Sequence, residues 1–102
     1  MKKLALISTF IFSTFSVSAE PTSTPAAVPK NLHVYDLHGN TYIDLLAHGC
    51  SNIRYYLSPT HPKYDAIVSI LLTAQTANKP VIIRYEGCNP QSQGNIVGVY
   101  LP

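Results

Sequence analysis

The sequence has 102 residues, of which 46% are hydrophobic and 12% are charged, and its formal net charge is +2. This length has room for one small domain and excludes a two-domain enzyme. From residue 20 onward, five basic and five acidic side chains cancel, so the chain without its first nineteen residues is neutral. A neutral domain lacks the positive surface that binds phosphate backbones or anionic membranes, so we expect no nucleic-acid partner.

Residues 1–19 have the pattern of a signal peptide. Lys2 and Lys3 supply a positive start, residues 4–15 are apolar apart from Ser and Thr, and residues 17–19 (VSA) are the small side chains that precede a cleavage site. The apolar stretch is shorter than the roughly 20 residues that span a bilayer as a helix. We therefore predict an exported protein, periplasmic or secreted, with no membrane span after cleavage.

Residues 20–30 (EPTSTPAAVPK) hold three prolines among small and polar residues. This composition buries little apolar surface and predicts a flexible, extended tether. The folded domain is then expected over residues 31–102.

The two cysteines, Cys50 and Cys88, predict one disulfide bond, because small exported domains commonly need a covalent crosslink. A redox site of the thioredoxin type would need a Cys-x-x-Cys motif, which is absent, and a metal site would need more ligands. In the chain-entropy model, closing this loop stabilises the domain by about 4 kcal/mol.

The predicted elements follow the order β-β-β-α-β-β. Residues 32–37 and 41–46 flank a His-Gly-Asn turn and predict a hairpin, and the alternation over 51–57 predicts a third strand. Residues 63–77 carry apolar side chains at helical spacing, with prolines before them and Asn-Lys-Pro after them, which predicts a helix that Thr60 or His61 caps. Residues 81–85 and 95–101 predict two further strands, joined by a loop over 87–94.

A mainly β domain with one helix between the third and fourth strands has the layout of an OB-fold, a small Greek-key barrel. In that barrel the third and fifth strands are parallel neighbours, so Cys50 and Cys88 are expected close together. The alternative is an open α+β sheet with the helix packed on one face.

The segment Tyr64–Leu101, with LLTAQTANKPVIIRYEGC followed by NIVGVYL, resembles part of a known toxin family. It is similar to the C-terminal half of the B subunits of subtilase-cytotoxin and pertussis-like AB5 toxins, and of small exported OB-fold proteins related to them. The resemblance implies an OB-fold, assembly into a homopentamer and recognition of glycans on host cells. No sugar-contacting residue is transferred from that family to this sequence.

The second and third strands predict a candidate ligand surface. If Ile53, Tyr55 and Leu57 point inward on the third strand, and Ile43 and Leu45 do so on the second, alternate residues on both strands point outward. These outward residues are Tyr42, Asp44, Arg54 and Tyr56. A tyrosine ring combines a flat apolar face with a hydroxyl group, which suits a partly wet recognition site. The alternative is that these tyrosines only cover the sheet.

We predict no catalytic residues, no cofactor and no metal site, and hence no enzyme. The sequence has no metal, phosphate-loop or nucleophile motif, and we interpret His48, near Asp44 and Ser51, as a polar loop residue. The expected function is a non-catalytic, toxin-B-subunit-like module that binds carbohydrate through its OB-type face. The alternative is a small periplasmic protein that binds or inhibits another protein.

Overall fold

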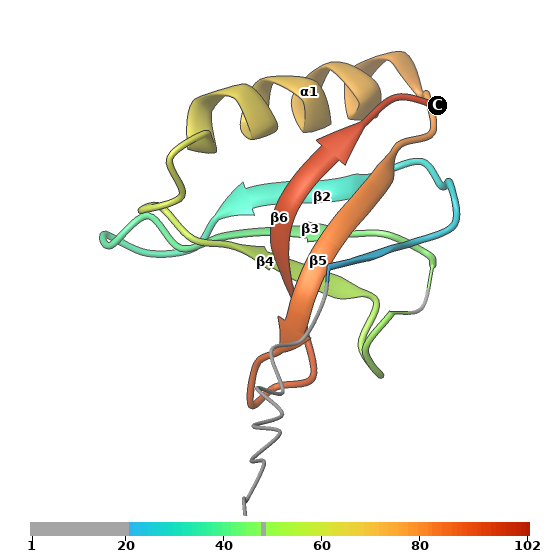
Figure 1. Cartoon of the computed structure of the whole chain (residues 1–102). Helices are drawn as coiled ribbons and strands as arrows, with labels where there is room; N and C mark the ends of the chain where they lie inside the picture. The colour runs from blue at the N-terminus through green and yellow to red at the C-terminus, as the bar shows by residue number, and fades with distance from the viewer. Residues whose placement is uncertain (1–20, 48) are drawn as a thin grey trace, which may run out of the picture.

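The chain folds into one curved β-sheet with a helix lying across one end (Figure 1). The computed structural model describes residues 21–47 and 49–102, so the predicted signal peptide lies outside the described residues. The elements are β1 (Thr22–Ser23), β2 (Lys30–Val34), β3 (Thr41–Asp44), β4 (Arg54–Leu57), α1 (Tyr64–Ala77), β5 (Ile82–Cys88) and β6 (Gly94–Tyr100). The prediction of a mainly β domain with one helix is confirmed.

The strands form a single six-stranded sheet in the order β1-β5-β6-β4-β3-β2. Strands β4 and β6 are parallel neighbours, with Tyr55 opposite Gly94 and Tyr56 opposite Asn95, as predicted for the third and fifth strands. However, β1 and β2 lie at opposite edges of the sheet, so the strands do not close into a barrel. The closed OB-type barrel is therefore wrong, and the alternative, an open α+β sheet with one packed helix, describes the fold.

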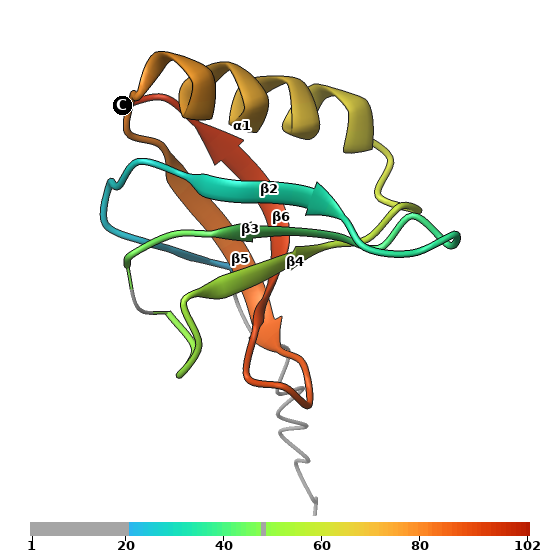
Figure 2. The same ribbon diagram turned by 180° about the vertical axis from the view of Figure 1, so that it is seen from behind.

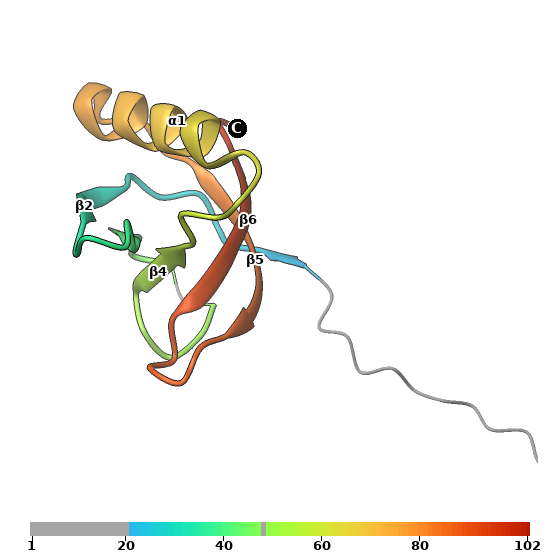
Figure 3. The ribbon, with the colours of Figure 1, turned by 90° about the vertical axis from the view of Figure 1, so that its left-hand side faces the viewer.

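The N-terminal segment pairs with strands on both sides of the sheet. Its first part runs along β5 (Figure 3): β1 is antiparallel to β5, and Ala27 and Val81 exchange backbone hydrogen bonds of 3.0 and 2.9 Å. The buried Pro29 then has no N–H to donate, and from Lys30 onward the chain pairs with β3 instead. The two parts of one segment therefore cover two different edges of the sheet.

Residues 21–30 are consequently packed on the sheet and are not the flexible tether that their composition predicted. The side chain of Thr24 is buried, and its hydroxyl accepts a hydrogen bond of 3.1 Å from the backbone N–H of Ile83. The composition was misleading because this segment contributes backbone hydrogen bonds along an edge, where prolines are tolerated between the bonded residues.

Helix α1 covers the core by packing against β2 and β6, as the view from behind shows (Figure 2). Its buried residues, Ile67, Leu71 and Ala74, follow the helical spacing that the sequence predicted. The whole core is made of Ile43, Leu45, Ala47, Tyr55, Leu57, Ile67, Leu71, Ala74, Val81, Ile83 and Ile96. In the described residues, no helix is both long and apolar enough to cross a membrane.

Both ends of α1 are held by specific hydrogen bonds. At the start, Nδ1 of His61 accepts a hydrogen bond of 2.9 Å from the backbone N–H of Lys63, and Nε2 donates to the carbonyl of Val97 at 3.0 Å. At the end, Asn78 adopts a left-handed conformation with φ 58°, and the N–H of Lys79 bonds to an α1 carbonyl at 2.8 Å. The bonds of His61 precede the helix: its N-cap residue is Lys63, which has no side-chain cap hydrogen bond, so the prediction that Thr60 or His61 caps α1 is wrong.

The predicted disulfide between Cys50 and Cys88 is confirmed, with their Cα atoms 6.0 Å apart. It joins the segment before β4 to the last residue of β5. The loop after it spans only residues 89–93, because β5 continues to Cys88 and β6 begins at Gly94. The crosslink therefore fixes this loop beside the start of β4.

Candidate functional site

The four residues predicted as a ligand surface share one face of the sheet. In the antiparallel register of β3 and β4, Tyr42 lies opposite Tyr56 and Asp44 lies opposite Arg54. The residues between them, among them Ile43 and Tyr55, are buried. Because successive strand residues point to opposite faces, this register sets two cross-strand pairs side by side on the outer face.

Asp44 and Arg54 form a two-point ion pair. The Nε of Arg54 lies 2.7 Å from Oδ1 of Asp44, and its Nη2 lies 3.1 Å from Oδ2. The amide of Asn31 donates a further hydrogen bond of 2.9 Å to Oδ2. The hydrogen bonds from Arg54 hold the pKa of the Asp44 carboxyl below its ordinary value, and the same contact raises the pKa of Arg54.

A row of aromatic rings lies beside this ion pair. The ring centroid of Tyr42 is 5.4 Å from that of Tyr56, 5.6 Å from that of His33 and 6.0 Å from that of Tyr35. The hydroxyl of Tyr56 donates to the side-chain oxygen of Asn40 at 2.6 Å, so Tyr56 supports the neighbouring turn. The ring of Tyr35, by contrast, is 72% exposed, and its face is open to solvent.

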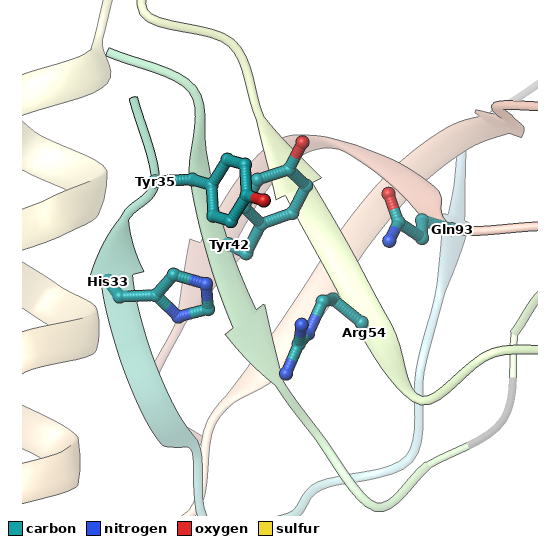
Figure 4. Close-up of a pocket in the computed structure, with 5 residues that line it drawn as sticks. All are labelled: His33, Tyr35, Tyr42, Arg54 and Gln93. Atoms are coloured by element: carbon teal, nitrogen blue, oxygen red, sulfur yellow. The ribbon is translucent and has the colours of Figure 1, made fainter. Parts of the chain in front are cut away.

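Together these elements enclose a hollow of about 220 Å³ on the outer face (Figure 4). It is lined by His33, Tyr35, Tyr42, Arg54 and Gln93. In the described part of the chain, the hydroxyls of Tyr35 and Tyr42 have no intramolecular hydrogen-bond partner. The hollow therefore offers open ring faces beside polar groups that are free to bind a ligand.

Two further groups of the hollow have a defined role because their other atoms are already bonded. Nδ1 of His33 donates to the carbonyl of Asn31 at 2.7 Å, which leaves Nε2 as the ring nitrogen available to a ligand. The side-chain oxygen of Gln93 accepts from the amide of Asn89 at 2.8 Å, which leaves the Gln93 amide nitrogen as a donor. Figure 4 shows the Gln93 amide pointing toward the hollow.

Gln93 reaches this position because its loop has a fixed shape. The side-chain oxygen of Asn89 accepts hydrogen bonds from the backbone N–H groups of Gln91 and Gln93, at 3.0 and 2.9 Å. The backbone N–H of Asn52 donates to the carbonyl of Ser92 at 3.1 Å and ties the loop to the segment before β4. The adjacent disulfide holds the same two segments together.

The sequence thus predicted Tyr42, Asp44 and Arg54 at this place but missed the other three lining residues. His33 lies on β2, where it pairs opposite Tyr42 after a shift of strand register between Lys30 and His33. No pattern of residues in the sequence predicts this shift. Gln93 lies in the loop just before β6, far along the chain from β2 and β3, and it reaches the hollow only through the fold. Of these three residues, only Tyr35 could have been predicted from the sequence, because it stands at the end of a strand beside a turn, where an aromatic side chain is exposed.

His48, which the sequence suggested is a polar loop residue, lies outside the described residues. Over residues 21–47 and 49–102, no three His, Cys, Asp or Glu side chains gather closely enough to hold a metal ion.

The fold and this hollow define a small disulfide-bonded α+β domain with a row of aromatic rings on one face of its sheet. Comparison with protein-family models, with curated proteins and with solved structures found no match.

Proposed function

We propose that this protein is an exported, non-catalytic binding module that recognises carbohydrate through the hollow on its outer face. The observation that carries the proposal is the exposed ring of Tyr35 beside Tyr42, with both hydroxyls free in the described structure. Sugar rings present C–H groups on one side and hydroxyls around their edge, and tyrosine matches both. The resemblance of residues 64–101 to toxin B subunits supports the same class of ligand.

A glycan array with purified protein tests this proposal. Tyr42→Ala and Tyr35→Ala should each lower binding by at least about tenfold, because aromatic anchors carry much of the energy of such contacts. Tyr100→Ala is the matched control, since Tyr100 is also an exposed tyrosine but lies at the end of β6, outside the hollow. Equal losses in all three variants, or no glycan binding by the parent protein, would reject the proposal.

The outward side of α1 supports self-assembly, which the resemblance to B subunits also implies. Asp65 is the one charged residue in this fourteen-residue helix, whereas a solvent-facing helix usually carries several charges. Its other exposed residues are Ala66, Ser69, Leu72, Thr73, Thr76 and Ala77. We include a homopentamer in the proposal, and light scattering should give five times the mass of one chain; a monomer at micromolar concentration would reject it.

A second candidate function, the binding or inhibition of a periplasmic protein, is favoured by the tip between β2 and β3. Leu37 is fully exposed there, and the carboxylate of Asp36 fixes the tip by accepting from the backbone N–H groups of His38 and Asn40, at 3.1 and 3.2 Å. A rigid, exposed leucine suits an apolar pocket on a protein. A periplasmic pull-down should then lose its partner with Leu37→Ser and keep it with Leu46→Ser, which changes another exposed leucine.

A further inference from the structure

The single guanidinium in the hollow is already paired. Among the residues that line the hollow, Arg54 alone carries a permanent charge, and two of its nitrogens bind the carboxylate of Asp44 at 2.7 and 3.1 Å. The Asp44 side chain is the more buried partner, with 12% of its surface exposed against 39% for Arg54. The pair therefore presents a guanidinium edge to the hollow but no net positive charge.

We propose that the hollow takes an uncharged sugar, and that Asp44 is a specificity-determining residue that disfavours sugars bearing a carboxylate. This inference rests on the proposed carbohydrate-binding function and names the class of ligand for the same site.

The free groups of the hollow match hydroxyls rather than an anion. A sugar hydroxyl both donates and accepts hydrogen bonds. Nε2 of His33 is available for a hydrogen bond, the Gln93 amide nitrogen is a donor, and the hydroxyls of Tyr35 and Tyr42 can act as either donor or acceptor. A site for a carboxylate would instead present donors and an unpaired cation.

The size of the hollow also favours a single sugar unit. Its volume of about 220 Å³ is below the roughly 300–1,000 Å³ that pockets for drug-sized ligands occupy. The ring of Tyr35 stands at its open side, where it can cover one face of a sugar ring (Figure 4).

A carboxylate in the hollow would meet an unfavourable effect. Asp44 occupies Nε and Nη2 of Arg54, so a ligand carboxylate can reach only the remaining Nη edge of the guanidinium. There it lies close to the carboxylate of Asp44, a like charge, and the two carboxylates share the single positive charge of Arg54. The nearest other cation by strand register is Lys30, opposite Asp44, and it lines a second hollow together with Asp44 itself, Leu46 and Ile53.

The test uses matched pairs of oligosaccharides on one array, in which each uncharged chain is printed with and without a terminal carboxylated sugar. The parent protein should bind the uncharged member of each pair more tightly, by on the order of tenfold. This is the difference in affinity that the loss of one charge-assisted hydrogen bond produces. Asp44→Asn keeps the shape of the side chain but removes its charge, and it should reduce this preference by on the order of tenfold. Asp65→Asn makes the same change of net charge on the exposed start of α1 and should leave the preference unchanged.

Salt provides a second readout that needs no variant. Binding of an uncharged sugar to the parent protein should be the same at about 0.15 M and about 1 M sodium chloride, whereas a contact between a free guanidinium and a carboxylate weakens as salt screens it. Binding restricted to carboxylated members, or binding that falls steeply with salt, would overturn this inference and leave the proposed function standing. The absence of binding to every glycan would overturn both.

Discussion

Gly94 is buried under two tyrosine rings at the disulfide end of the sheet, and adding a methyl group there tests how tightly this end is packed. A Cβ at Gly94 would lie 2.8 Å from Cδ2 of Tyr55 and 3.1 Å from Cδ2 of Tyr85. The ring of Tyr55 cannot retreat easily, because it has no exposed surface and its hydroxyl donates to the carbonyl of Ala47. Gly94→Ala therefore forces either the ring or the β4–β6 pairing to shift.

We expect Gly94→Ala to destabilise the protein by about 2–3 kcal/mol, in the upper part of the range for overpacked cores, since the obstructing atoms belong to a rigid ring. Urea unfolding followed by circular dichroism, with the disulfide intact, gives this difference as a change of midpoint at constant slope. In thermal unfolding, each kcal/mol lost corresponds to a fall of roughly 4–8 °C in Tm for a domain of this size.

Gly98→Ala is the matched control on the same strand. The nearest atom to a Cβ at Gly98 is Cβ of Arg84, at 3.9 Å, which is ordinary van der Waals contact. Gly98→Ala should therefore be neutral or stabilise by up to about 1 kcal/mol, because alanine has less conformational freedom in the unfolded chain. If Gly94→Ala unfolds at the same urea concentration as the parent, or if both variants lose equal stability, the packing argument is refuted.

Three further predictions concern stability. Replacing both cysteines by serine should lower the free energy of unfolding by about 4 kcal/mol, since the disulfide closes a loop with a sequence separation of 38; a loss below 1 kcal/mol in urea unfolding would contradict this. The pKa of Asp44 is lowered in the folded state, so the stability that its carboxylate contributes is present above the ordinary pKa of 3.8 and is lost as the pH falls through the lower folded value. Asp44→Asn should therefore make the free energy of unfolding depend less on pH in this acid range. The change should be less than about 1 kcal/mol, because Arg54 is partly exposed. His61→Ala removes two hydrogen bonds at the start of α1 and should cost about 1–2 kcal/mol, whereas Thr60→Ala, at an exposed turn residue, should cost less than about 0.5 kcal/mol.

The parts of the fold that the sequence predicted are those set by local periodicity. Helix α1 follows from apolar spacing over three turns, and the inward position of Tyr55 and Leu57 follows from alternation. The pairing of the disulfide was predictable because a sequence with two cysteines has only one possible pairing within the chain.

The open sheet was less predictable because it depends on where the N-terminal segment forms its hydrogen bonds. Three prolines made residues 20–30 look unable to pair, yet the backbone of Thr24 and Ala27 bonds to β5 at 2.9 and 3.0 Å. Most of these bonds are made by main-chain atoms, and the one side chain that takes part, the Thr24 hydroxyl, has no pattern around it that marks it as buried.

The residues of the candidate site likewise fall into a group that local patterns predict and a group that they do not. The outward residues of β3 and β4 were predictable from alternation alone, whereas His33 and Gln93 join them through strand register and a loop contact. Such contacts between distant segments are set by tertiary structure, and no pattern within either segment encodes them.

The ion pair in the hollow also links the site to the fold. A slip of one residue in either β3 or β4 would turn the charged residue of that strand, Asp44 or Arg54, toward the core and expose its buried neighbour, Ile43 or Tyr55. Burying one charge apart from its partner would be far more costly than the modest gain from their pairing in the native register. The pair therefore contributes little to stability in the native register and strongly disfavours the shifted one. On this reasoning Asp44 and Arg54 help to select the register that sets the aromatic rings of the hollow beside each other. The double variant Asp44→Ser/Arg54→Ser should therefore remain folded. Its NMR spectrum, however, should lose the single well-resolved set of β3 and β4 amide resonances. A single unchanged set of those resonances would show that the apolar core selects the register without the pair.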